Sequence, residues 1–210
     1  MSFDAPSSTQ RSLSVRPLSP AQSATRRRLL DAAQSLATEG GYEAVGMREV
    51  AARAGVSSAT AYTHFASRDH LLVELLSELA EATIKLIQTD LPRPQGAPVF
   101  RVGAALRWGV KSLEESPSLQ VALMRAYLSG AAENAHAREL LAAAISEWIK
   151  AALEGTETDD SDAVVETFGY ICFGAMVAIA TGHRTPREIA AIMERAAIAL
   201  FGRDALSTSE

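Results

Sequence analysis

The sequence has few of the residues that carry covalent, redox or metal chemistry. Its single cysteine, Cys172, excludes an internal disulfide, so we expect a reducing compartment, the cytoplasm. The four histidines are scattered, and we find no HExxH, GxSxG or P-loop motif and no pair of Glu-x-x-His motifs. We therefore predict no catalytic residues, no metal site and no cofactor.

Long hydrophobic runs are also missing. The strongly apolar stretch 168–180 has 13 residues, which is too short to cross a bilayer. The first residues are polar and include prolines, and they lack the apolar centre of a signal peptide. With 210 residues, 48% of them hydrophobic, the chain can form one or two compact domains with a sizeable core.

The charge is divided unevenly along the chain. The net charge is −5, but residues 1–70 contain eight Lys and Arg against six Asp and Glu, net +2, and the remaining 140 contain 12 against 19, net −7. Counterion release depends on phosphates being neutralised locally, so an acidic distal part does not prevent DNA binding. The first 70 residues are the basic part of the chain, and their charge is compatible with a polyanionic partner.

A helix-turn-helix pattern lies within residues 47–72. A short helical run ends at Gly55, and Ser57 is a typical N-cap residue, so a second helix begins at about Ser58 and closes at Phe65. Ser67 caps a third helix. Two helices joined by a short turn containing glycine form the arrangement whose second helix enters the DNA major groove.

The second of these helices carries small and hydroxyl-bearing side chains. Ala61 apart, residues 58–64 include no large aliphatic residue, and their hydroxyls and imidazole suit phosphate oxygens and base edges. Ala59 and the methyl group of Thr63 could touch thymine methyl groups.

The segment AGVSSATAYTHFASRDHLL resembles the recognition segment of TetR-type transcriptional regulators, commonly written AGVSxGTLYxHFxSKExLL. The resemblance covers about residues 25–76 and implies DNA binding. It implies that Tyr62 and His64 contact phosphate and that Thr60 and Arg68 support the backbone clamp. It also implies that Ser58, Ala59 and Thr63 face bases. The predicted DNA-binding set is Arg26, Arg48, Ser58, Ala59, Thr60, Tyr62, Thr63, His64 and Arg68.

Three positions depart from the family pattern. Ala59 replaces a frequent glycine, and Ala61 replaces a leucine. Gly46 stands where many members have threonine, so the threonine side chain that would contact phosphate there is missing. The phrase GGYEAVGMREVAARA, with LMRAY later, more loosely resembles the actinobacterial repressors of sterol catabolism in this family.

The first helix is expected from about Thr25 to the Gly40–Gly41 pair. Arg26 to Arg28 at its start oppose the helix macrodipole, so helix stability does not explain them. Contact with the DNA backbone explains them, and a solvated face is the alternative. Residues 1–22 read as a flexible tail, which either reaches the minor groove through its two arginines or is a plain extension.

The rest of the chain predicts an all-α protein. A helix from Arg68 leaves the DNA-binding domain and ends at the LPRPQGAP segment, residues 91–98. Further helices are expected at 98–115, 117–129, 133–154, 161–182 and 186–201. The predicted domains are a tail (1–22), a helix-turn-helix domain (23–70) and a helical effector-binding and dimerisation domain (71–205).

The last two helices, about 161–201, are expected to form a homodimer interface. The all-round apolar segment 168–180 must be buried on most faces, and a two-fold symmetric reader needs two half-sites. TetR-type proteins are similar in dimerising through their last two long helices. The alternative is that these helices only complete the core of the monomer.

An effector pocket is expected in the distal domain by family resemblance. The candidate lining residues are Trp108, Met124, Tyr127, Trp148, Tyr170, Phe173 and Met176, and the candidate polar anchors are Arg107, Arg125, Asn134 and His136. Residues of these types also fill cores routinely, which is the alternative. The sterol-repressor resemblance implies a steroid or lipid-like effector, either free or as a coenzyme A thioester.

The predicted function is a dimeric repressor that a bulky hydrophobic effector releases from a pseudo-palindromic operator. Ligand among the central helices would tilt the helix from Arg68 and change the separation of the reading helices, about 34 to 36 Å in a bound pair. The alternatives are a helical enzyme or binding protein that acts on a lipid-like molecule without DNA binding, and an adaptor that binds protein.

Overall fold

The protein folds as a set of packed helices, in agreement with the all-α prediction. The computed structural model describes residues 19–89, 115–129, 135–154 and 161–201. The described helices, in chain order, are α1 (Pro20–Ala44), α2 (Met47–Arg53), α3 (Ser58–His64), α4 (Arg68–Thr89), α6 (Pro117–Leu128), α7 (Ala135–Leu153), α8 (Ser161–Ala180) and α9 (Pro186–Phe201). Residues 98–114 of the helix predicted at 98–115 lie outside the described residues.

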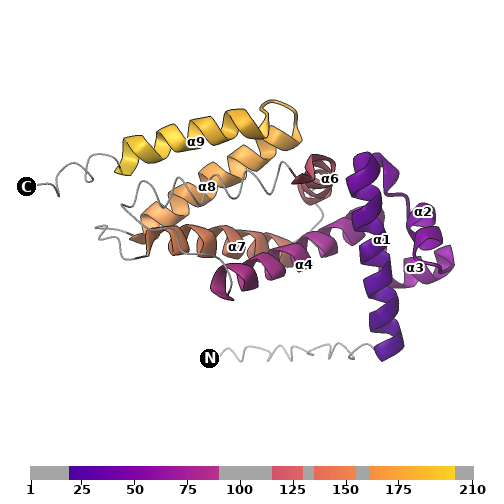
Figure 1. Cartoon of the computed structure of the whole chain (residues 1–210). Coiled ribbons are helices and arrows are strands. Elements are labelled where there is room, and N and C mark those ends of the chain that lie inside the picture. Colours follow the sequence, from indigo (N-terminus) through magenta and orange to yellow (C-terminus); the bar gives the residue numbers. More distant parts are fainter. Residues whose placement is uncertain (1–18, 90–114, 130–134, 155–160, 202–210) are drawn as a thin grey trace, which may run out of the picture.

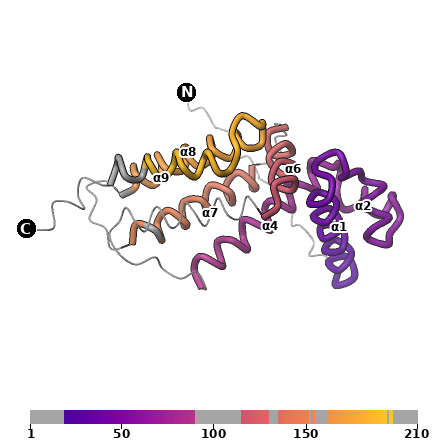
Figure 2. Tube along the Cα trace, turned by 45° about the horizontal axis from the view of Figure 1, so that its top comes forward, coloured from indigo at the N-terminus to yellow at the C-terminus, as the bar shows by residue number. Residues whose placement is uncertain are grey.

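The helices form two groups joined by α6 and α4. Figure 1 and Figure 2 both show α1, α2 and α3 at one end of the molecule and α7, α8 and α9 running side by side at the other. The long helix α4 starts in the first group and runs into the second beside α7, and α6 lies between the groups. Because α4 and α6 pack against both groups, a change in one group can be transmitted to the other through these two helices.

Helix α1 begins five residues earlier than the sequence analysis predicted. The side-chain oxygen of Ser19 accepts from the Gln22 N–H and the Gln22 side chain accepts from the Ser19 N–H, a capping box with Pro20 in the first turn. Residues 20–22 are therefore helical and do not belong to a flexible tail. The arginines at 26–28 lie beyond the first turn, where the macrodipole acts little, so the macrodipole argument for them was wrong.

A kink at Gly41 turns the end of α1 toward α6. Gly41 has φ 68° and ψ −161°, a left-handed conformation that glycine adopts without a Cβ clash. A Cβ at Gly41 would come within 4.0 Å of the Ser118 carbonyl oxygen at the start of α6. The kink therefore places the next two residues, Tyr42 and Glu43, next to the distal group.

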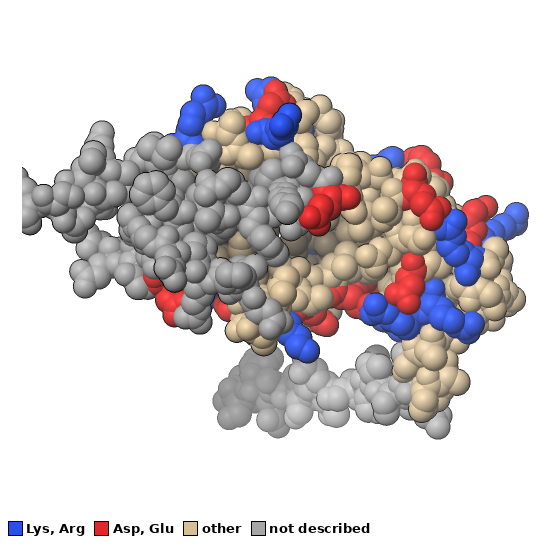
Figure 3. All heavy atoms as spheres, in the orientation of Figure 1, with Lys and Arg blue, Asp and Glu red and all other residues tan. Residues whose placement is uncertain are grey.

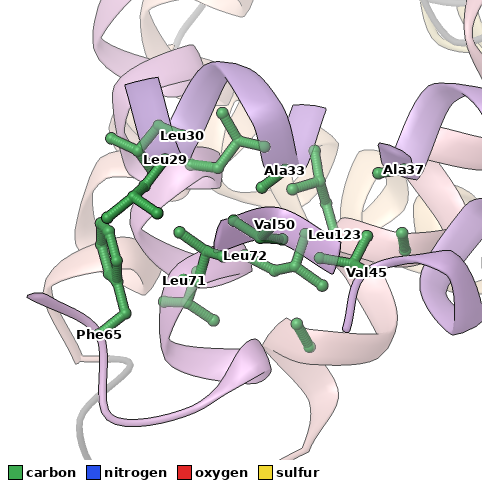
Figure 4. Close-up of a cluster of buried hydrophobic side chains, with 14 of the residues drawn as sticks. Leu29, Leu30, Ala33, Ala37, Val45, Val50, Phe65, Leu71, Leu72 and Leu123 are labelled. Carbon is green, nitrogen blue, oxygen red and sulfur yellow. The ribbon is translucent and has the colours of Figure 1, made fainter. Parts of the chain in front are cut away.

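The main hydrophobic cluster extends across both groups. Leu29 and Leu30 of α1 and Leu71 and Leu72 of α4 are at most 1% exposed, and Leu123 of α6 is equally buried among them. Figure 4 shows Leu123 in the same close-up as these side chains. Burying a leucine side chain contributes about 1.5–3 kcal/mol, so the contact between the groups is a substantial part of the core.

A second cluster joins α7, α8 and α9. It contains Ile149 of α7, Phe168 and Cys172 of α8, and Met193 of α9, all nearly covered. Burial raises the pKa of the Cys172 thiol to about 12, so the group stays a neutral thiol at physiological pH. Cys172 is therefore a core residue of this cluster.

The apolar segment 168–180 is part of a longer helix, α8, which has 20 residues. Within the described residues, one helical stretch, Asp162–Ala180, is long and apolar enough to cross a bilayer by length and composition. The 13-residue length of segment 168–180 therefore does not by itself exclude a membrane span. Core helices of soluble proteins meet the same criterion, and α8 contributes Val165, Phe168 and Ile179 to the second cluster.

Candidate functional site

The turn between α2 and α3 has the geometry of a helix-turn-helix. Gly55 adopts φ 67°, and the Val56 N–H donates to the Ala51 carbonyl over 3.0 Å. Ser57 caps α3 as predicted, because its Oγ accepts from the Thr60 N–H at 3.0 Å. The cap fixes where α3 begins.

Helix α3 is held by a small buried face and presents the rest to solvent. Ala61 is fully buried and Phe65, just after the helix, is 1% exposed. On the opposite face Ala59 and Thr63 are exposed, and Tyr62 is 55% exposed. Residues three and four apart lie on one side of a helix, so Ala59, Tyr62 and Thr63 form one outward surface.

The remaining predicted α3 residues lie around this outward surface. Ser58 and Thr60 are partly buried, and the Thr60 hydroxyl lies 2.8 Å from that of Ser57. The Thr63 hydroxyl donates to the Thr60 carbonyl at 2.6 Å, which leaves its methyl group to the surface. His64 is partly buried and its ring lies 6.4 Å from that of Phe65.

Helix α2 brings one more predicted residue to this end of the molecule. Arg48 is exposed in the first turn of α2. The N-cap residue of α2 is Gly46, which has no side chain to cap the helix. The DNA contact predicted for Arg48 stays a prediction, as do those of the α3 residues.

Arg26 is turned toward α4 and away from the outward surface of α3. Its guanidinium forms ion pairs with Glu74 and with Glu78, the latter at 2.8 Å, and its carbon lies 5.4 Å from the centroid of the Phe65 ring. A DNA contact by Arg26 would require these ion pairs to break. The structure thus gives Arg26 a different role from the predicted one, joining α1 to α4.

The two arginines that follow Arg26, Arg27 and Arg28, differ from it and from each other in their ion pairs. Arg27 pairs with Asp31 at 2.9 Å and Glu78 at 3.1 Å. Arg28 forms no ion pair among the described residues, and its one hydrogen bond, to Thr25, is long at 3.4 Å. Figure 3 shows basic and acidic side chains intermixed at this end of the molecule.

Arg68 points to the junction between the two groups of helices. Its guanidinium carbon lies 3.7 Å from the centroid of the Tyr42 ring, and its Nη1 donates to the Tyr42 carbonyl at 3.4 Å. The Tyr42 hydroxyl donates to Asp69 at 2.5 Å, and burial and this bond raise the pKa of Tyr42. Arg68 therefore holds the first turn of α4 against the end of α1, at the junction between the two groups of helices.

A cavity of about 390 Å³ lies between α6, α7 and α8. Three predicted lining residues meet there, with Tyr127 and Phe173 in an edge-to-face contact at 5.8 Å and Tyr170 71% exposed at one edge. Burial raises the pKa of Tyr127, and the charge of Arg138 opposes the shift. The volume is in the range of small-molecule sites.

Most of the cavity wall was not predicted from the sequence. The further lining residues are Arg138, Leu141, Ala142, Ile145, Ser146, Val165, Glu166 and Gly169. Those on α7 recur at helical spacing, as do those on α8, so each set is one face of its helix. That spacing was visible in the sequence, but only the packing shows which faces meet.

The other residues predicted for the pocket lie elsewhere. Met124 and Met176 line a separate void of only about 10 Å³, so they are core residues. Trp148 packs on the second cluster, and its buried indole N–H has no hydrogen-bond partner among the described residues. Trp108 lies outside the described residues, as do Arg107 and Asn134.

Two predicted polar anchors are placed differently from the expectation. The guanidinium carbon of Arg125 lies 4.1 Å from the centroid of the Tyr42 ring, and its Nη1 pairs with Glu43 at 3.0 Å, so Arg125 belongs to the junction. His136 is exposed at the start of α7 and does not line the cavity. Arg138, two residues after His136 on α7, does line the cavity and takes the place predicted for them.

These features define a helix-turn-helix protein with a second helical domain that contains a cavity. The chain belongs to the tetR family of bacterial regulatory proteins. The model of that family matches residues 29–75, and the model of the tetracyclin repressor-like C-terminal domain matches residues 96–200. The resemblance stated from the sequence is confirmed, and with it the expectation that the protein is a regulator and not an enzyme.

Curated relatives and solved structures agree with this assignment. The chain is 32% identical to the HTH-type transcriptional repressor KstR of Rhodococcus jostii over 186 residues, 88% of this chain and 86% of the relative. It is 31% identical to KstR of Mycobacterium tuberculosis, with 88% and 84% covered.

Two solved structures show the same fold. A TetR transcriptional regulator from Rhodococcus sp. RHA1 matches with a TM-score of 0.69 and 26% identity over 85% of this chain and 96% of that one. The regulator FadR of Bacillus subtilis, solved in complex with stearoyl-CoA, matches with a TM-score of 0.58 over 83% and 97%. At 14% identity the second match concerns the fold alone.

Proposed function

We propose that the protein is a cytoplasmic, dimeric repressor that leaves its operator when a bulky hydrophobic effector binds the cavity between α6, α7 and α8. The observation that carries the proposal is the pairing of an outward α3 surface with a largely apolar cavity in one chain. The KstR relatives are repressors by name, and this supports repression as the output here.

The outward surface of α3 reads the operator. Ser58, Ala59 and Thr63 face bases, and Tyr62 and His64 contact phosphate, with Thr60 supporting the contact. Arg48 adds a phosphate contact from α2. Because Arg26 is engaged by two carboxylates, Arg28 replaces it as the arginine of α1 that reaches the backbone.

A second copy of the chain completes the reader. The operator is a pseudo-palindrome, and the two copies pair through α8 and α9. Support comes from Ile192 of α9, which is 41% exposed, and from the high apolarity of α8, of which a small share is buried in the single chain. Covering these apolar surfaces against a second copy would be favourable.

The effector is an apolar molecule with a polar end. The walls include Leu141, Ile145 and Val165, and Arg138 offers a partner for an anionic or carbonyl group. A steroid acid, a fatty acyl chain or a coenzyme A thioester of either has this chemistry. FadR was solved in complex with stearoyl-CoA, so a protein of this fold can accept an acyl-CoA molecule.

A mobility-shift assay on the DNA upstream of the protein's own gene tests the proposal. The expected result is a sequence-preferring complex whose affinity falls steeply as salt rises. Cholic acid, cholyl-CoA and stearoyl-CoA are then added separately. At least one should lower operator affinity by about 5-fold to 150-fold, the range of ordinary allosteric coupling.

The same titration contains the refuting results. A protein that shows no preference among DNA sequences is not an operator-specific repressor. A probe that binds tightly in isothermal calorimetry and leaves operator affinity unchanged would show that the cavity does not regulate DNA binding.

A further inference from the structure

The end of α1 contacts both α4 and α6 through one aromatic ring. The guanidinium carbons of Arg68 on α4 and Arg125 on α6 lie 3.7 Å and 4.1 Å from the centroid of the Tyr42 ring. Glu43 pairs with both, through Oε2 to Arg68 at 3.5 Å and through Oε1 to Arg125 at 3.0 Å. We call these four residues the Tyr42 joint.

The two sides of the Tyr42 joint are held unequally. On the α4 side, Tyr42 has the contact with Arg68, the hydrogen bond from Arg68 to its carbonyl, and the bond from its hydroxyl to Asp69. On the α6 side, the charged contacts of the joint all come from Arg125, whose side chain is 50% exposed. The joint can therefore open at Arg125 while Tyr42 stays fixed to α4.

Helix α6 connects this joint to the cavity. Arg125 and Tyr127 are two residues apart, about 200° around the helix, so they point to different sides of α6. Tyr127 lines the cavity and contacts Phe173, and Arg125 contacts Tyr42. A rotation or shift of α6 that changes the position of Tyr127 also moves Arg125 relative to the Tyr42 ring.

We propose that the Tyr42 joint carries the coupling between the cavity and the DNA-binding helices, with Arg125 as the contact that is made or broken. Tyr42 and Glu43 are positioning residues in this scheme, since they act on DNA through α4 and α1. The proposal rests on the proposed function, because it requires a protein that binds DNA and responds at the cavity.

The cation–aromatic contact is suited to this role. A guanidinium over an aromatic ring keeps its attraction while sliding, and the carboxylate of Glu43 adds a charge contact on the same side. Loss of Arg125 from the ring also leaves Glu43 with Arg68 alone, so one movement changes two contacts.

The test uses operator binding as the input, so that it does not depend on the identity of the effector. Coupling free energies are reciprocal, so operator binding at α3 must change α6 if the joint couples them. Amide hydrogen exchange is measured across Pro117–Leu128 in the full chain, with and without the operator fragment found by mobility shift. In the wild type, operator should slow exchange there by about fivefold or more.

Three variants and a control separate coupling from simple stability. Arg125→Met and Tyr42→Leu remove one partner of the contact, and the operator effect on α6 should fall to less than about twofold. Tyr42→Phe keeps the ring and loses the bond to Asp69, so it should keep the effect. Lys150→Met makes the same cation-to-methionine change at an exposed position of α7, outside the cavity lining and outside α8 and α9, and should behave as the wild type.

Each result decides the proposal. Support requires that Arg125→Met unfolds in one cooperative transition and keeps its operator affinity within about threefold while losing protection of α6. Protection that persists in Arg125→Met overturns the proposal, as does a wild type whose α6 does not respond to operator. If Tyr42→Leu fails to fold, Arg125→Met decides, because its side chain is half exposed. Failure of the proposed function is seen separately, as the absence of a sequence-preferring complex in the mobility shift, and the inference then falls with it.

Discussion

Replacing Arg28 by glutamine should weaken operator binding and flatten its salt dependence. The Nη1 of Arg28 lies 4.0 Å from the place where a Cβ on Gly55 would be, so the side chain reaches the turn that enters α3. Each phosphate that a cation neutralises contributes about 0.9 to the slope of log K against log salt. With one Arg28 on each half-site of a dimer, the slope should become shallower by about 1.8.

Arg26→Gln is the matched control for Arg28→Gln, two positions earlier on the same helix. It removes ion pairs to Glu74 and Glu78, each worth about 0.2–1 kcal/mol at partly exposed positions, and a contact with Phe65 of about 0.5–1 kcal/mol. The free energy of unfolding should therefore fall by about 1–3 kcal/mol, from the sum of these contacts. The salt slope should not change.

Fluorescence anisotropy with labelled operator at several salt concentrations gives the slopes, and urea unfolding gives the stabilities. We expect opposite patterns, a change in the salt slope for Arg28→Gln and a change in the free energy of unfolding for Arg26→Gln. If Arg26→Gln flattens the slope and Arg28→Gln does not, the ion pairs of Arg26 do not keep it from DNA and the assignment is refuted.

Three further predictions concern single side chains. Tyr62→Ala should lower operator affinity in anisotropy titrations and change the free energy of unfolding by less than about 0.5 kcal/mol, because the side chain is 55% exposed; unaltered affinity would contradict the phosphate contact. Phe65→Ala should cost about 3–5 kcal/mol in urea unfolding, since the ring is 1% exposed, and a cost below about 1 kcal/mol would show that the core tolerates its loss. Cys172 should not react with a thiol reagent in the native protein at pH 8, because its pKa is about 12 and it is buried, and should react in urea; rapid native reaction would show that α8 opens.

The helix ends were predictable where the chemistry is local. Ser57 and Ser67 cap the helices after them through hydrogen bonds to residues three positions on, so the sequence alone located α3 and α4. The start of α1 was missed for the opposite reason. The Ser19 capping box has the same local chemistry, but its first turn carries no buried residue and Pro20 was read as part of a tail.

The candidate site was less predictable because its contacts join distant segments. Residue type pointed to Tyr127 and Phe173, which do line the cavity, and equally to Met124 and Met176, which fill the core. Arg125 was expected at the pocket, and its partners on α1 are more than 80 positions away, so no pattern of spacing could show them. Composition cannot distinguish a pocket wall from a packed interior.

The core that extends from α1 through α4 to α6 limits how this regulator can be rearranged. Leu119 and Leu123 of α6 are at most 5% exposed, and they cover residues that would otherwise meet solvent in the first 76 positions. A chimera that joins those positions to a foreign sensor would uncover leucine side chains unless the replacement helix reproduced the shape of α6. Exchanging effector-binding domains between such regulators therefore requires that α6 be transferred together with the first 76 positions.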